Sequence, residues 1–223
     1  MKLLITGFGP FPGVPDNPSA NLARRVGRTL SSAGHNGVTA TTAILPTEWR
    51  ALPRMLEPLG ARLTPDLIIH FGLHERARSF HIEQRARNLA ATRPNTRGEN
   101  SANRKISRFA PDALDSPLCA SSIAAKLRRR GLPAVSSYDA GDYLCNMAYF
   151  LSLARGRTAA AATPVLFVHI PSLERVGLTS HGIFDGGLAA AESAIHQVRR
   201  LRRVGAPKTR HMAPDLRISG INP

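Results

Sequence analysis

The chain has 223 residues and a formal net charge of +15, from 30 Lys and Arg against 15 Asp and Glu. This length allows a sizeable core, and no linker-like stretch divides it, so we expect a single domain over residues 1–204 and a basic tail over 205–223. Two cysteines exclude a disulfide framework and fit a reducing compartment. No apolar run approaches the roughly 18 residues of a membrane span. We therefore expect a cytoplasmic protein that does not bind membranes.

The excess of positive charge makes a nucleic acid the first partner to consider. The basic residues do not gather in one block, but recur at residues 24–25, 85–108, 128–130 and 199–203. No zinc-finger spacing, RNA-binding aromatic motif or heptad repeat accompanies them. We therefore expect a solvated, Arg-rich surface that binds nucleic acid only non-specifically, if at all.

Short apolar runs alternate with amphipathic segments along the chain, and this order predicts an α/β fold with a largely parallel sheet and helices on both faces. Thr47 is the expected cap of the second helix, and Gly186 or Gly187 is expected to precede the last one. We expect buried strands at residues 2–6, 66–72 and 164–171, an alternating strand at 38–45, a short strand at 132–137 and a more polar strand at 80–88. We expect helices at about 19–30, 47–56, 116–131, 143–153 and 188–204.

A loop rich in Gly and Pro, residues 6–19, follows the first strand. Its glycines do not have the spacing of a dinucleotide-binding motif, and Pro10 and Pro12 block direct entry into a helix, so we exclude that function. A rigid loop beyond the end of a strand is where α/β proteins build ligand sites. Phe8 and Phe11 either line such a site or fix the loop to the core.

The segment over residues 138–146 predicts a tight turn into a helix. Gly141 permits the turn, and Asp139 or Asp142 can cap the helix. Cys145 then falls in the first turn, where unpaired N–H groups and the helix dipole favour a thiolate. The sequence thus offers Cys145 as a nucleophile, although most free cysteines are small buried apolar residues.

A cysteine nucleophile needs a base and a group that orients the base. His169 ends a buried strand 24 residues after Cys145, a separation that suits a parallel crossover and would bring both to one edge of the sheet. Glu83 lies in an otherwise basic strand and is either an ion-pair partner or a functional acid. As an orienting carboxylate it would fix the imidazole tautomer and stabilise its cation.

Three groups of segments then carry a resemblance to a known family. They are TGFGPF at residues 6–11 with NPS at 17–19, HFGL at 70–73 with IEQRARN at 82–88, and DAGDYLCN at 139–146 with VHIP at 168–171. In this order they resemble pyroglutamyl peptidase I, also called pyrrolidone-carboxylate peptidase, a family of cysteine peptidases. The resemblance covers residues 1 to about 204.

The resemblance implies an open three-layer α/β/α sandwich. It implies a cysteine exopeptidase that removes an N-terminal pyroglutamyl residue from peptides through an acyl-enzyme, without a metal or cofactor. Cys145 would be the nucleophile, His169 the general base and acid, and Glu83 the orienting carboxylate. The family is often homotetrameric, so a homo-oligomer is expected on the same grounds.

The resemblance also implies the substrate-binding residues. Phe8, Phe11 and Tyr143 would form apolar walls around the flat lactam ring, and Asn17 would help to arrange the polar contacts. Arg93 falls where the family has an arginine near the oxyanion. A pyroglutamyl group has no charged amine, so an aromatic slot with a few amide-directed hydrogen bonds suits it.

Three departures from the family bear on the substrate. Leu73 stands where some members have glutamine in the lactam pocket, and the neighbouring turn with His74, Glu75 and Arg76 is unusually charged. The loop over residues 95–105 also differs from the family pattern. Two alternatives therefore accompany the peptidase hypothesis: a catalytically silent member that binds blocked peptides, and a basic nucleic-acid-associated protein on a hydrolase-like fold.

Overall fold

The computed structural model describes residues 1–32, 37–91, 94–101, 104–158, 163–173 and 177–205. Among these residues, six strands form one sheet in the order β2-β1-β3-β8-β4-β7. Neighbouring strands run parallel, except that β4 and β8 are antiparallel, so the largely parallel sheet is confirmed. The strands are β1 (Lys2–Phe8), β2 (Thr39–Leu45), β3 (Leu67–His74), β4 (Phe80–Glu83), β7 (Ala134–Ser137) and β8 (Val165–Pro171).

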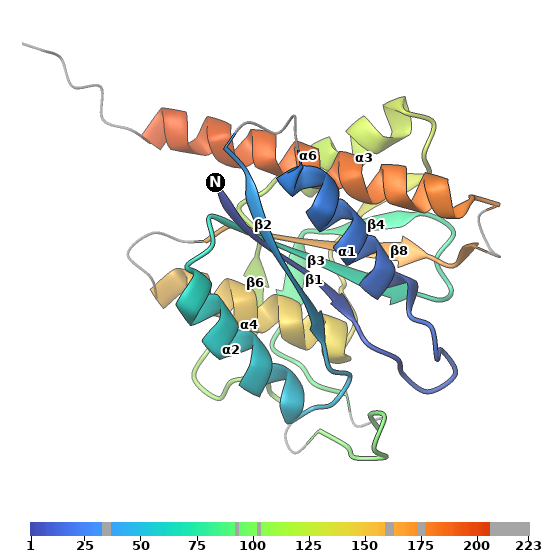
Figure 1. Ribbon diagram of the computed structural model, residues 1–223. Helices are drawn as coiled ribbons and strands as arrows, with labels where there is room; N and C mark the ends of the chain where they lie inside the picture. Colours follow the sequence, from blue (N-terminus) through green and yellow to red (C-terminus); the bar gives the residue numbers. More distant parts are fainter. Residues whose placement is uncertain (33–36, 92–93, 102–103, 159–162, 174–176, 206–223) are drawn as a thin grey trace, which may run out of the picture.

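Helices cover both faces of this sheet (Figure 1). On one face lie α1 (Pro18–Ser31), α3 (Ala120–Arg129) and α6 (Ser180–Gly205), which bury one apolar cluster against the strands. On the other face lie α2 (Ala51–Leu63) and α4 (Leu144–Thr158), which bury a second cluster. The α/β/α sandwich is therefore confirmed. Of the helices in the described ranges, none is both long and apolar enough to cross a membrane.

Burial on both faces explains why the central strands are almost continuously apolar. Every residue of β8 is buried, and so are all residues of β1 after Lys2. A strand between two helical layers has no solvent face, so its sequence shows no alternation of polar and apolar residues.

The polar strand predicted at residues 80–88 is two strands. Its first half is β4, within the main sheet, and its second half is β5 (Arg85–Arg87), which pairs antiparallel with β6 (Ala113–Asp115). Gln84 lies at the change of partner: its Nε2 donates to the Ser116 carbonyl at 2.7 Å, and its Oε1 accepts from the Ala120 N–H at 3.0 Å. This amide ties the start of α3 to the junction, a long-range contact that the local pattern does not reveal.

Two predicted helix starts are wrong. Thr47 does not cap a helix, because its hydroxyl donates to the Pro10 carbonyl and α2 begins only at Ala51. Gly186 and Gly187 lie within α6 rather than before it. They are required there by close packing, because a Cβ on Gly186 would collide with the Phe80 ring, and one on Gly187 would lie 2.8 Å from Leu22.

The expected parallel crossover from the Cys145 segment to the His169 strand is also wrong. β7 and β8 are not neighbours, because β4 lies between them. Since β4 is parallel to β7 and antiparallel to β8, the strand before Cys145 runs opposite to the strand of His169. The two residues nevertheless meet, because α4 begins near the edge at which β3 and β8 end.

A buried polar chain crosses the second core. His70 is fully buried in β3, where its Nδ1 lies 2.6 Å from Thr6 Oγ1 and its Nε2 lies 2.9 Å from Ser152 Oγ. Desolvation lowers the pKa of His70 to about 3. The imidazole is therefore neutral in the folded protein throughout the mildly acidic range.

We expect this histidine to make stability pH-dependent. Below about pH 6.5 the unfolded chain binds a proton at residue 70 that the folded protein does not, so His70 lowers the free energy of unfolding as pH falls. Between pH 7 and pH 5 the loss should be about 2 kcal/mol. Urea unfolding of wild type and His70→Gln at both pH values measures it. The exposed His196→Gln is the matched control, and equal pH dependence in all three proteins would contradict the expectation.

Candidate active site

Cys145 is the second residue of α4, as predicted, and is partly exposed. The chain enters the helix through a turn in which Gly141 adopts φ +80° and donates its N–H to Asp139 Oδ1 at 3.0 Å. In this position the sulfur is close to the positive end of the helix dipole, which favours a negative charge.

The sulfur of Cys145 lies against the backbone of β3. A Cβ built on Gly72 would be 2.9 Å from Cys145 Sγ and 3.0 Å from the Phe167 ring. Gly72 is also the register partner of His169 on β8. Glycine at this position therefore leaves room for the sulfur beside the histidine.

His169 and Glu83 form a buried pair. His169 Nδ1 donates to Glu83 Oε1 at 2.8 Å, and their side chains are 7% and 0% exposed. Burial alone would lower the pKa of His169, but hydrogen bonds to Cys145 and Glu83 outweigh it and raise this pKa above its ordinary value of 6.5. The geometry thus favours an imidazolium between a carboxylate and the sulfur, the arrangement of an activated thiol.

Glu83 is held from its backbone as well. The Tyr149 hydroxyl, fully buried in α4, donates to the Glu83 carbonyl at 2.8 Å. Glu83 Oε2 is buried without a hydrogen-bond partner in the described part of the chain. A carboxylate oxygen left unpaired in a core is costly, which is more typical of a functional group than of a structural one.

Asn146 is a structural anchor of the site that the sequence did not predict. It is fully buried, and its Oδ1 accepts from the Arg87 N–H at 2.8 Å. Its Nδ2 donates to the carbonyls of Arg87 and Leu89 at 2.8 and 2.9 Å. These bonds fix the first turn of α4, and so Cys145, to the segment that continues from Glu83. The position of Asn146 directly after the candidate nucleophile was the available signal.

The predicted aromatic residues are placed differently from one another. Phe8 is buried in the core with its ring centroid 6.4 Å from that of Phe167, so it fixes the loop to the core. Phe11 is half-buried and pairs with Val14 across the loop.

Tyr143 is half-buried two residues before Cys145, and its hydroxyl donates to the Pro94 carbonyl at 3.0 Å. Its ring meets that of Trp49 edge-on at 5.2 Å, and Trp49 belongs to the apolar cluster against which Tyr143 and Cys145 both pack.

Asn17 organises the first loop. Its Oδ1 accepts from the N–H and hydroxyl of Ser19, at 3.1 and 2.8 Å, and caps α1. Its Nδ2 donates to the Gly9 carbonyl at 2.9 Å. Both ends of the amide are therefore engaged in holding the loop.

The remaining two predicted residues are not brought to the sulfur by the described structure. Leu73 packs against the cluster beneath α1, α3 and α6, whereas Cys145 packs against the cluster on the opposite face. Arg93 lies outside the described residues.

Two further histidines lie beside His169. The ring of His74 is 5.6 Å from that of His169 and 5.3 Å from that of His81. Within the described ranges, no group of three or more His, Cys, Asp or Glu residues is arranged to hold a metal ion.

We expect Gly72→Ala to impair the site more than the fold. The added methyl would push Cys145 Sγ away from His169. Such a displacement should lower kcat/KM for a pyroglutamyl amide, the substrate that the resemblance implies, by about 10- to 100-fold. Overpacking should cost about 1–3 kcal/mol of stability. Gly182→Ala in α6 is the control, because its Cβ would meet only the flexible Leu178 side chain, at 3.3 Å. Wild-type kcat/KM in a folded Gly72→Ala would contradict the expectation.

Comparisons with known proteins show the family of the chain. The family model of pyroglutamyl peptidase matches residues 1–199. The pyrrolidone-carboxylate peptidase of Pyrococcus furiosus is 33% identical over 172 residues, which are 77% of this chain and 81% of the relative. That of Gloeobacter violaceus is 31% identical over 206 residues, 91% of this chain and 97% of the relative. A mutant pyrrolidone carboxyl peptidase from P. furiosus superimposes with a TM-score of 0.78 at 29% identity, covering 88% of this chain and 99% of the other.

Proposed function

Because the chain belongs to the pyroglutamyl peptidase family, we propose that it removes an N-terminal pyroglutamyl residue from peptides, using Cys145, His169 and Glu83. The observation that carries the proposal is the buried His169, bound to Glu83 on one side and to Cys145 on the other. This arrangement supplies a nucleophile, a proton carrier and an orienting charge.

In the first half of the reaction, the Cys145 thiolate attacks the carbonyl carbon that links pyroglutamate to the next residue. Backbone N–H groups at the start of α4 are suited to hold the oxyanion, and Arg93 is proposed to assist them. His169 gives its proton to the departing amine as the C–N bond breaks. The pyroglutamyl group remains as a thioester on Cys145.

In the second half, the now neutral His169 takes a proton from water, and the resulting hydroxide attacks the thioester carbonyl. The C–S bond breaks, and the thiolate returns beside the imidazolium of His169. Pyroglutamate is released. Glu83 stabilises the imidazolium in both halves and fixes the tautomer of the neutral ring.

The lactam pocket is proposed to lie between the first loop and the start of α4. Tyr143 and Phe11 are the half-buried aromatic residues that can face a flat, uncharged ring, and Phe8 supports the loop from the core. Asn17 shapes this loop through its hydrogen bonds. Leu73 packs toward the opposite helical layer, so it is not part of this proposed pocket.

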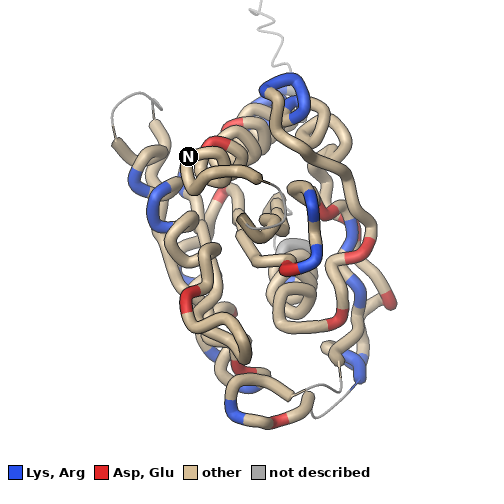
Figure 2. Tube along the Cα trace, turned by 90° about the vertical axis from the view of Figure 1, so that its right-hand side faces the viewer, with Lys and Arg blue, Asp and Glu red and all other residues tan. Residues whose placement is uncertain are grey.

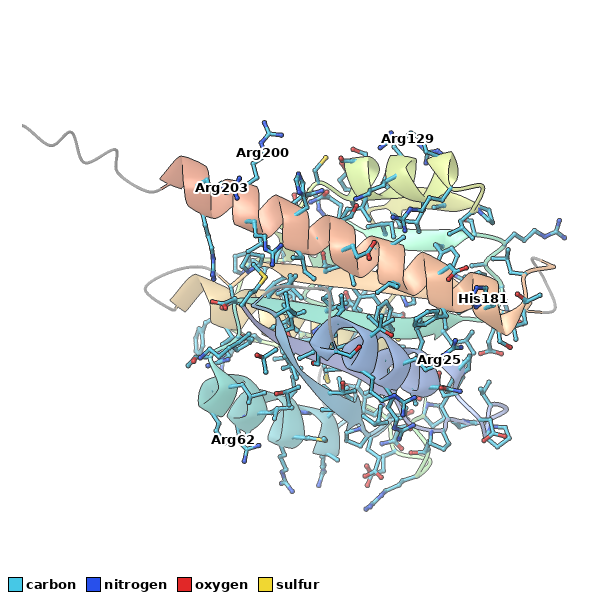
Figure 3. All side chains as sticks on the ribbon, turned by 45° about the horizontal axis from the view of Figure 1, so that its top comes forward. Arg25, Arg62, Arg129, His181, Arg200 and Arg203 are labelled. Carbon is cyan, nitrogen blue, oxygen red and sulfur yellow. The ribbon has the colours of Figure 1, made fainter. Side chains whose placement is uncertain are left out.

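The distribution of charge favours a peptidase over a nucleic-acid-binding protein. Lys and Arg are spread over several parts of the trace rather than gathered in one block (Figure 2). Arg62 extends from α2 on one side of the sheet, whereas Arg129 and Arg200 extend from α3 and α6 on the other (Figure 3).

We also propose a cytoplasmic location, which the scarcity of cysteine supports. We propose a homo-oligomer as well, and the family resemblance implies a tetramer.

The test is release of a fluorogenic amine from a pyroglutamyl amide by freshly reduced protein, at several enzyme concentrations. We expect a rate proportional to enzyme concentration, and no release from the matching prolyl amide, whose ring lacks the lactam carbonyl. Binding of the amide without turnover would favour the catalytically silent member. Absence of both binding and turnover would contradict the proposed function.

A further inference from the structure

His74 lies on β3 two residues after Gly72, the glycine against which the candidate nucleophile packs. Side chains two residues apart on a strand point to the same face, so His74 and Gly72 share the face on which Cys145 Sγ lies. His74 is the last residue of β3 and is half-buried. It is therefore a partly exposed side chain at the edge where β3 ends, on the face of the sheet that carries the sulfur.

His74 and His81 also flank the proton donor. His81 is the register partner of His169 on β4, and the ring of His74 meets that of His169 edge-on at 5.6 Å. In the proposed reaction His169 must reach the departing amine. Because the His74 ring lies 5.6 Å from that of His169, we expect the residue attached to that amine to approach His74.

The chemistry of His74 and His81 suits an anion. Neither the His74 nor the His81 ring has a hydrogen bond or ion pair with another side chain in the described part of the chain, and both are partly exposed. The turn after His74 carries Arg76 and Arg78, both exposed, against the single acid Glu75. An imidazole N–H, neutral or cationic, can donate to a carboxylate.

A bound anion would change the protonation of the His74 and His81 rings. Burial lowers the pKa of His74, and His169 and His81 lower it further, while Glu83 opposes them. Burial also lowers the pKa of His81, with Glu83 opposing and His169 adding to the effect. Cys145 on α4 also faces His169, with which it shares a hydrogen bond. A bound carboxylate would favour the cationic rings, so its advantage should grow as pH falls.

We propose that His74, with His81 beside it, selects substrates that carry a carboxylate on the leaving-group side of the scissile bond. This rests on the proposed function. The carboxylate has two possible sources: an acidic side chain on the residue after pyroglutamate, or the free C-terminus of a pyroglutamyl dipeptide. Both present the same group within one residue of the departing amine.

Two matched pairs of peptides separate these sources. The pair pGlu-Glu-NH2 and pGlu-Gln-NH2 tests the side chain, and the pair pGlu-Ala and pGlu-Ala-NH2 tests the C-terminus. Within each pair the ratio of kcat/KM values at one pH cancels the pH dependence of the catalytic residues. We expect a preference for the acid of about tenfold at pH 6 in at least one pair, falling toward unity at pH 8.

The variants locate the preference. His74→Asn should remove most of it and its pH dependence while pGlu-Gln-NH2 is still cleaved, and His81→Asn should reduce it. His196→Asn, at an exposed position on α6 on the other face of the sheet, should leave it unchanged. If His74→Asn does not fold, His74→Gln replaces it. Ratios near one in wild type, or ratios unaffected by either His74 variant, would overturn the proposal.

Failure of the proposed function can be told apart from failure of this inference. If wild type cleaves none of the four peptides, the affinities of Cys145→Ser for each pair, measured by calorimetry, decide the inference instead. Tighter binding of the acid, lost in Cys145→Ser/His74→Asn, supports selection by His74. Equal or undetectable binding within both pairs overturns it.

Discussion

Cys145→Ser is expected to lower kcat/KM for a pyroglutamyl amide by about 10⁴-fold or more. Serine is nearly isosteric with cysteine, so the packing against Gly72 and the His169–Glu83 pair should be retained. The hydroxyl, however, does not ionise beside an imidazolium as a thiol does, so the resting nucleophile is lost. Rates at several enzyme concentrations, with the unfolding temperature as a check on folding, measure the effect.

Cys119 provides the matched control. It is exposed at the start of α3, on the opposite helical layer, and its sulfur lies 3.3 Å from Ser121 Oγ. The Ser121 hydroxyl and nearby backbone N–H groups lower the pKa of Cys119, so it too should be a reactive thiol. Cys119→Ser should nevertheless keep the wild-type rate. Substantial turnover by Cys145→Ser, or loss of turnover in Cys119→Ser, would show that the nucleophile was assigned wrongly.

The position of Cys145 was predictable because its signals are local. A glycine turn followed by a helical pattern places Cys145 in the first turn whatever the sheet order, and the structure has it there. His169 was predictable because an apolar run ending in proline marks the end of a buried strand. Their meeting was predicted correctly for a wrong reason, since β4 separates β7 from β8.

The features that could not be predicted depend on contacts between segments far apart in the chain. Nothing near Gly186 indicates that α6 must approach Phe80 so closely that only glycine fits. Likewise, the pairing of Asn146 with residues 87 and 89 and the approach of His74 to His169 follow from the fold rather than from any spacing. Strand order and side-chain contact are decided by tertiary packing, which local propensity does not encode.

Glu83→Gln tests the third member of the site, and we expect it to lower kcat by about 10²- to 10⁴-fold. The amide can still accept a hydrogen bond from His169 Nδ1, so position is largely kept while the charge is lost. The carboxylate is one of the groups that raise the pKa of His169. Without it the imidazolium should lose its proton at lower pH, and the alkaline limb of the kcat/KM profile should move down by about one pH unit or more.

The direction of that shift separates an orienting charge from a structural acid. In wild type, the raised pKa of His169 adds stability that is fully present below pH 6.5 and is lost as pH rises through the folded-state value. Glu83→Gln should therefore be less stable than wild type mainly at neutral and lower pH, and the alkaline limb of its kcat/KM profile should move down as well. Glu192→Gln, which breaks the ion pair with Arg130 on the opposite layer, should change neither. If Glu83→Gln lowers the rate without moving the alkaline limb, Glu83 supports the packing of β4 but does not set the charge of His169.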